Sequence, residues 1–143
     1  MLKSNATATW TGNFKAGSGT MTPAHAAEVP FSAGTRFEGQ RGSNPEEMIG
    51  AALAGCFSMA LTVGLEKAGA TPQAVRTSAE VTLEKGDAGF SITRIHLDTE
   101  VEAGGITEDG FQEVAEATKK ACPVSKALAA VETITLDARL QTT

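Results

Sequence analysis

Two cysteines, Cys56 and Cys122, are the residues of this 143-residue chain whose type is most directly suited to chemistry. The thiolate form of cysteine is a nucleophile, so either residue could attack a substrate or form a transient disulfide. Buried cysteine is also a common inert core residue, and cysteine is a frequent zinc ligand. Taken alone, Cys56 favours the inert interpretation. The positive charges of Lys119, Lys120 and Lys126 would favour a thiolate at Cys122.

A metal site would need both cysteines together with the only two histidines, His25 and His96. Strong zinc sequences place their ligands in pairs a few residues apart, whereas these four residues are scattered along the chain. His96 lies between Ile95 and Leu97 in an alternating segment, which indicates a side chain that faces solvent. We therefore predict no bound metal. The segment Gly17–Gly19 lacks the third glycine of a dinucleotide-binding loop.

The charge of the chain argues against several classes of partner. Twelve Lys and Arg residues against 17 Asp and Glu residues give a formal charge of -5. Without a basic excess to neutralise phosphates, we predict no binding to nucleic acid or to a membrane. The first residues show no cationic segment followed by an apolar one, so we expect no secretory signal and a cytoplasmic location. A permanent disulfide is not expected in that reducing compartment.

A long helix should position the first cysteine. Asn44 can cap its first amide groups, and Pro45 suits its first turn. Residues 48–65 contain no charge, and apolar or small side chains occur all round the predicted helix, so we expect it to be buried on every side. Its richness in Ala and Gly, with no flanking aromatic belt, argues against a membrane span. Gly69 should end the helix.

The remaining elements follow from hydrophobic periodicity. A second helix should begin after Thr107 and end by Pro123, and Ile92 is out of phase with its strand, which predicts a bulge. In the otherwise irregular segment before the long helix we expect one short strand around Thr35–Phe37. Alternation predicts strands over Ala6–Gly12, Val75–Leu83, Ile95–Val101 and Ile134–Leu140, and Gly17–Thr22 should be the hairpin partner of the first strand. The predicted fold class is α+β: one domain over residues 1–143, with a mostly antiparallel sheet, a long buried central helix and a second helix.

Four segments stand out in chain order: Thr35–Gly39, Gly42–Ala60, Asp87–Phe90 and Cys122–Ser125. Together with the positions of the two cysteines, they resemble the OsmC and organic hydroperoxide resistance protein family over nearly the whole chain. The resemblance implies an OsmC-like intertwined homodimer and a thiol peroxidase that reduces small organic hydroperoxides and hydrogen peroxide. It also implies that no metal, haem or flavin is used, and that an external dithiol reductant protein, expected to carry dihydrolipoyl groups, regenerates the enzyme.

Within this resemblance, Cys56 matches the peroxidatic cysteine and Cys122 the resolving cysteine, while Arg36 and Glu46 match the arginine and glutamate that activate the thiol. A thiol with a pKa of about 8.5 is mostly protonated near neutral pH, so a guanidinium would stabilise the thiolate and the developing alkoxide. A carboxylate could hold that guanidinium through two hydrogen bonds. The plainer interpretations are a solvated Arg36 and a Glu46 that only complements the helix end.

Glu46 and Cys56 are ten residues apart, which on a straight helix is about 15 Å along the axis and about 80° around it. One helix therefore cannot bring them together. We predict two central helices that run antiparallel in a homodimer, so that each active site is shared between chains.

Two other functions remain open for the same residues. The disulfide could serve a thiol redox sensor without turnover, or both cysteines could be inert in a structural or small-molecule-binding domain. For the peroxidase we expect a largely apolar substrate pocket near Phe57 and Met59.

Overall fold

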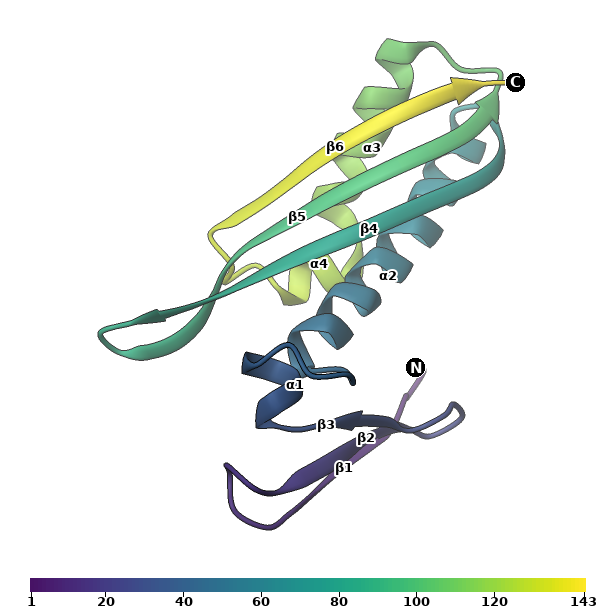
Figure 1. Cartoon of the computed structure of the whole chain (residues 1–143). Coiled ribbons are helices and arrows are strands. Elements are labelled where there is room, and N and C mark those ends of the chain that lie inside the picture. The colour runs from purple at the N-terminus through teal and green to yellow at the C-terminus, as the bar shows by residue number, and fades with distance from the viewer. The chain divides into compact units, whose positions relative to one another are not determined.

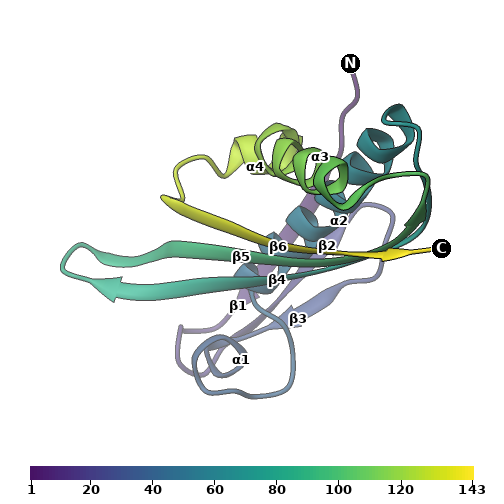
Figure 2. The same cartoon turned by 90° about the horizontal axis from the view of Figure 1, so that it is seen from above.

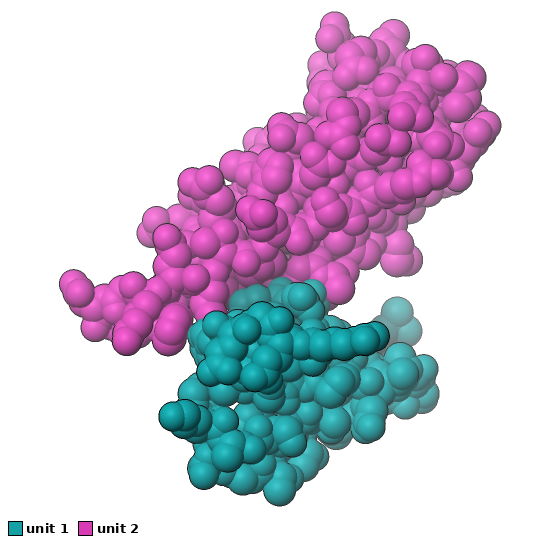
Figure 3. All heavy atoms as spheres, viewed as in Figure 1, with its two compact units in different colours: residues 1–48 teal, residues 49–143 magenta.

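The computed structural model describes all 143 residues, which form two compact units, residues 1–48 and residues 49–143 (Figure 3). Each unit contains one three-stranded sheet. The fold class is α+β, as predicted, with four helices and two sheets. That the whole chain acts as one domain stays a prediction.

The sheet of the first unit consists of β1 (Ala6–Thr11), β2 (Ser18–Pro23) and β3 (Val29–Phe31), in that order (Figure 1). Both pairings are antiparallel. β1 lies where the alternation of Thr with apolar residues predicts it, and β2 lies where its hairpin partner was expected. The third strand was not predicted, because three residues are too few to show a period of two.

The predicted strand around Thr35–Phe37 is wrong, because these residues belong to the short helix α1 (Ala33–Phe37). Its start is a capping box: the Ser32 hydroxyl accepts the N–H of Thr35, and the Thr35 hydroxyl accepts the N–H of Ser32. These reciprocal bonds satisfy amide groups that a helix otherwise leaves unpaired, so a five-residue helix forms here.

The long helix α2 (Pro45–Lys67) begins as predicted. The Asn44 side chain accepts the N–H of Glu47 at 2.8 Å and so caps the first turn. Gly69 ends the helix with a φ of 87°, a left-handed conformation that favours glycine. One stripe of α2 is fully buried and consists of Leu53, Phe57, Leu61 and Leu65.

The prediction that α2 is buried on every side is wrong for the single chain. Met59 is 75% exposed and Val63 is 48% exposed, on a different face from the buried stripe. By length and composition the helix could cross a membrane, with a mean hydropathy of 1.9. Its leucine stripe, however, belongs to the core of the second unit, which is the arrangement of a core helix. Uniform apolar composition does not reveal which face is buried within one chain.

The sheet of the second unit consists of β4 (Thr71–Gly86), β5 (Gly89–Gly104) and β6 (Thr133–Thr142). β4 and β5 are antiparallel, whereas β6 runs parallel to β5, so pairing in the whole chain is mostly antiparallel as predicted. The predicted bulge is confirmed: the register shifts between Thr82 and Leu83, which pair with Arg94 and Ile92.

Helices α3 (Glu108–Ala121) and α4 (Pro123–Ala127) connect β5 to β6 and lie on one face of this sheet (Figure 2). Thr107 caps α3, as predicted, by accepting the N–H of Gly110. The core joins the α2 stripe to alternate residues of β5 and to α3, including Ile95, Leu97, Val101, Phe111 and Ala115.

Candidate functional site

The second unit brings the two cysteines together. Cys56 lies in α2 and is partly exposed, whereas Cys122 lies at the junction of α3 and α4 and is 1% exposed. Both are free thiols, and each shifts the pKa of the other, so the two side chains are neighbours. Two thiols in contact, one of them accessible, can be linked by oxidation of the accessible sulfur.

Cys122 is held by the start of α4. Pro123 occupies the first helical turn, which leaves the Cys122 sulfur as the cap of that turn. The sulfur accepts the backbone N–H of Ser125 at 3.3 Å and lies 3.2 Å from its hydroxyl. Ser125 is itself buried. Sequence reasoning gave Ser125 no role, although it ends the Cys122–Ser125 segment.

The two thiols differ in acidity within this unit. Burial raises the pKa of Cys56, and its hydrogen bond to the Cys122 sulfur adds to that rise. Burial also opposes ionisation of Cys122, but the hydroxyl and N–H donors of Ser125, with the donor Cys56, outweigh it and lower the pKa of Cys122. The second unit alone therefore favours a thiolate at the buried cysteine.

The causes that shift the pKa of Cys122 are burial and hydrogen bonds rather than the predicted charges of Lys119, Lys120 and Lys126. Lys119 instead forms an ion pair with Glu116 at 2.7 Å. Lysines near a cysteine in sequence need not approach its sulfur, because their long side chains can pair with other groups, as Lys119 does with Glu116.

The first unit pairs Arg36 with Glu46. Arg36 Nε donates to Glu46 Oε2 at 3.1 Å, and Nη2 donates to Oε1 at 2.5 Å. Glu46 is 8% exposed, so the ion pair is shielded on the carboxylate side. This is the bidentate geometry in which a carboxylate fixes a guanidinium plane. Arg36 is therefore held by a partner and is not a freely solvated side chain.

The chain around the pair explains why these two residues meet. The Thr35 hydroxyl donates to the carbonyl of Ser43 at 2.6 Å, which ties α1 to the residues just before α2. The N–H of Ser43 donates to the carbonyl of Pro30, so the same residues are also tied to β3. These bonds bring the last turn of α1 against the first turn of α2, where Arg36 and Glu46 lie.

An apolar cavity of about 350 Å³ lies in the first unit beside this pair. Its lining includes Arg36, Pro45 and three aromatic residues, Trp10, Phe14 and Phe31. The pocket predicted near Phe57 and Met59 is not this one, because Phe57 is fully buried in the core of the second unit and Met59 is largely exposed. The aromatic residues come from separate segments, so no short motif could have revealed them.

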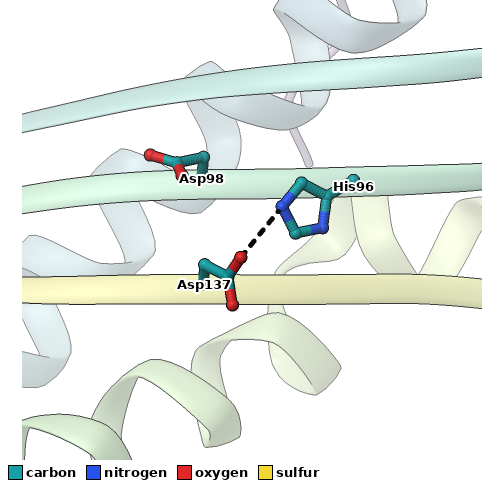
Figure 4. Close-up of side chains that lie close together, drawn as sticks. All are labelled: His96, Asp98 and Asp137. Carbon is teal, nitrogen blue, oxygen red and sulfur yellow. Dashed lines mark ion pairs between the residues drawn. The ribbon is translucent and has the colours of Figure 1, made fainter.

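A third polar cluster lies on the solvent face of the second sheet. His96, Asp98 and Asp137 offer potential metal-ligating atoms within 4.8 Å of one another (Figure 4). Both oxygens of Asp98 already accept hydrogen bonds from Arg139, at 2.7 and 2.9 Å, and His96 Nε2 lies 3.3 Å from Asp137. His96 faces away from the buried Ile95, as predicted. The arrangement is that of an ion-pair cluster on a sheet surface.

The predicted site residues thus form two pairs, Cys56 with Cys122 and Arg36 with Glu46, one in each unit. An α+β fold with two free thiols in contact is the architecture of a cysteine-dependent redox protein.

Comparison with known proteins gives the family. The OsmC-like protein family matches residues 37–137. Peroxiredoxin OsmC of Escherichia coli (strain K12) is 47% identical over 134 residues, which cover 92% of each chain. The chain belongs to the OsmC-like protein family, and it is a peroxiredoxin-type peroxidase with an antioxidant role.

Solved structures support the fold. The OsmC-like protein from Mycoplasma pneumoniae superposes with a TM-score of 0.76 at 16% identity, covering 99% of this chain and 98% of that one. The organic hydroperoxide resistance protein OhrB of Bacillus subtilis gives a TM-score of 0.66 at 23% identity, covering 96% and 98%. At these identities the likeness concerns the fold.

Proposed function

We propose that this protein reduces organic hydroperoxides, and hydrogen peroxide, through a sulfenic acid on Cys56 and a disulfide between Cys56 and Cys122. The observation that carries the proposal is the proximity of a partly exposed free thiol to a buried one, each of which shifts the pKa of the other. The exposed sulfur is the one a peroxide can reach, and the buried sulfur is placed to condense with it.

Burial in the second unit raises the pKa of Cys56. Activation of this thiol therefore needs a positive charge from elsewhere. Arg36 is the proposed source. Its guanidinium is oriented by Glu46 and would stabilise both the thiolate and the negative charge that develops as the peroxide bond breaks. Glu46 is a positioning residue in this scheme.

The chemistry proceeds in three balanced steps. The Cys56 thiolate attacks the terminal peroxide oxygen, the O–O bond breaks, and the alkoxide takes up a proton to leave as an alcohol. The Cys122 thiolate then attacks the sulfenic sulfur, the S–O bond breaks as the disulfide forms, and the departing hydroxide takes up a proton and leaves as water. A dithiol reductant reduces the disulfide to two thiols and is itself oxidised to a disulfide. No prosthetic group takes part, and dihydrolipoyl is the proposed reductant group.

We also propose that the enzyme is a cytoplasmic homodimer with shared active sites. The exposed apolar side chains Met59 and Val63 on α2 are suited to burial against a second copy of the helix. In an antiparallel pair of α2 helices, Arg36 and Glu46 of one protomer would approach Cys56 of its partner. This arrangement would supply a positive charge to Cys56, whose raised pKa reflects burial and the neighbouring Cys122.

The two cysteines should differ when each is replaced by serine. Cys56→Ser should abolish hydroperoxide consumption in a stopped-flow assay. Cys122→Ser should allow one turnover and then accumulate sulfinic acid on Cys56, because no thiol is left to trap the sulfenic acid. Equal loss of the first turnover in both variants would contradict the assignment. If the wild type oxidises once and does not cycle with excess dihydrolipoamide, the protein is a sensor.

A further inference from the structure

A groove with a volume of about 410 Å³ lies in the second unit, between the α3–α4 junction and the start of β6 (Figure 1). Its lining carries three lysines, Lys119, Lys120 and Lys126, and one carboxylate, that of Glu132. We call it the lysine groove. Positive charge is concentrated here although the whole chain has a formal charge of -5.

Two of the three lysines are open to a partner. Lys119 forms an ion pair with Glu116 at 2.7 Å. Lys120 and Lys126 are exposed and form no ion pair within the chain. Each of the three lies in the last turn of its helix, where the helix dipole favours a cation. The dipole explains each position separately, whereas the fold directs the charges of two helices into one groove.

The lysine groove also reaches the environment of Cys122. Ser125 lines the groove and is buried, and its hydroxyl lies 3.2 Å from the Cys122 sulfur. Apolar side chains of Ala129, Val131 and Ile134 form another part of the lining. A ligand that combines negative charge with a hydrocarbon arm would complement both kinds of surface.

We propose that the lysine groove docks an acidic segment of the dithiol reductant protein, with carboxylates of that segment facing Lys120 and Lys126. The inference rests on the proposed function, because it concerns the partner that reopens the proposed disulfide. The alkyl part of a dihydrolipoyl arm would lie against the apolar lining and direct its thiols towards Ser125 and Cys122. Complementary charges of this kind speed encounter and fix orientation.

Reduction from this side proceeds by two thiol–disulfide exchanges. One dihydrolipoyl thiolate attacks the Cys122 sulfur, the bond to Cys56 breaks, and Cys56 leaves as a thiolate that takes up a proton. The second dihydrolipoyl thiol loses its proton and attacks the arm's own sulfur in the mixed disulfide. The lipoyl ring closes as a disulfide, and Cys122 is released as a thiolate. The protein gains two electrons and the arm loses two.

The test compares dithiols that differ only in their surroundings. Two synthetic peptides each carry one dihydrolipoyl-lysine, flanked by glutamates in one and by glutamines in the other. The oxidised protein is mixed with either peptide, and the appearance of protein thiols is followed. The glutamate peptide should react about tenfold faster at about 20 mM salt. The advantage should shrink towards about 300 mM salt, because salt screens exposed charges.

Charge reversal locates the docking site. Lys120→Glu combined with Lys126→Glu should remove the advantage of the glutamate peptide, and arginine at both positions should retain it. The control combines Lys3→Glu with Lys15→Glu, two exposed lysines of the first unit, and makes the same change in net charge. It should keep most of the advantage. Neutral dihydrolipoamide should reduce all four proteins at similar rates, since it carries no carboxylate.

The outcomes separate docking from the peroxidase chemistry. Equal rates for the two peptides with the wild type, or equal losses in the groove variant and the control, would overturn the proposal. Failure of dihydrolipoamide to release thiols would instead contradict the proposed function. Fluorescence anisotropy of a labelled glutamate peptide with the Cys56→Ser protein then tests the groove without any disulfide. Binding should weaken about tenfold on charge reversal at Lys120 and Lys126, and unchanged binding would refute docking there.

Discussion

Arg36 and Cys56 lie in different units and have complementary properties. Arg36 is a cation fixed in orientation by Glu46, and Cys56 is an accessible thiol whose pKa is raised by burial. Bringing the two together would reverse the shift at the thiol, because an adjacent positive charge favours the thiolate. The proposed activation therefore needs the Arg36 guanidinium both as a charge and as a fork-shaped donor that Glu46 can orient.

Replacement of Arg36 tests that dependence. Arg36→Ala should slow oxidation of Cys56 by about 10²-fold to 10³-fold and move its pH profile towards alkaline pH. Arg36→Lys should recover only part of the rate, since an ammonium cannot form the bidentate pair with Glu46. Stopped-flow rates from pH 5 to pH 9 measure both effects. Arg41→Ala, an exposed arginine of the same unit, is the control, and an equal loss there would refute the assignment.

We expect Ser125 to influence the second proposed step, formation of the disulfide, through the acidity of Cys122. Its hydroxyl helps to lower the pKa of Cys122 against the effect of burial, so Ser125→Ala should raise that pKa. Formation of the disulfide at neutral pH should then slow several-fold, and the deficit should shrink as the pH rises. Ser125→Thr keeps a hydroxyl and should recover much of the rate. A pH-independent deficit in Ser125→Ala would indicate a packing effect instead.

At the scale of elements, the second sheet has two chemically different faces. Alternate residues of β5 are fully buried, including Leu97 and Thr99, while Asp98 between them faces solvent and pairs with Arg139 of β6. The parallel register of β5 and β6 places Asp98 directly opposite Asp137, so two like charges would repel without their partners.

The Asp98 pair should make stability depend on pH. Hydrogen bonds from Arg139 lower the pKa of Asp98 in the folded chain. Its stabilising effect is therefore present above the ordinary carboxyl pKa and is lost as the pH falls through the lowered value. Thermal unfolding midpoints of the wild type and Asp98→Asn should differ modestly at pH 7 and converge towards pH 2. Asp87→Asn, in the β4–β5 turn, is the control. A constant difference at all pH values would contradict this cause.

The elements also show how far sequence reasoning reaches. The long strands and α2 were predictable because periodicity and caps such as Asn44 extend over many residues. The helix α1 could not be predicted in the same way, because five residues cannot display a helical period. Its capping box, Ser32 with Thr35, lies in a segment that shows no other helical signal. The contact of Cys56 with Cys122 followed only from the resemblance. The hydrogen bonds of Ser125 and the cavity around Trp10 depend on packing between distant segments, which spacing does not encode.

At the scale of the whole molecule, the proposed active site requires a second copy of the chain. The single chain leaves Met59 and Val63 exposed on the uncharged middle of α2, and the pKa of Cys56 is raised by burial. One dimer through antiparallel α2 helices would meet both needs. Substituting lysine at both Met59 and Val63 should convert the protein to monomers, which analytical ultracentrifugation measures. Peroxidase activity should fall together with the dimer fraction.

Mixed dimers test whether the site is shared. A Cys56→Ser chain assembled with a Glu46→Ala chain should contain one intact site, formed by Cys56 of one protomer and Glu46 of the other. The heterodimer should regain about half of the wild-type activity, while neither homodimer does. Activity no higher than the sum expected from the separate homodimers would show that each chain builds its own site.

The central claim is that the accessible thiol is oxidised first and is then trapped by its buried neighbour. One equivalent of cumene hydroperoxide is added to the reduced protein, the reaction is quenched with an alkylating agent, and peptides are mapped by mass spectrometry. The account predicts a disulfide between Cys56 and Cys122 of the same chain, preceded at early times by sulfenic acid on Cys56 alone. Sulfenic acid on Cys122, or both cysteines recovered as free thiols after the peroxide is consumed, would contradict it.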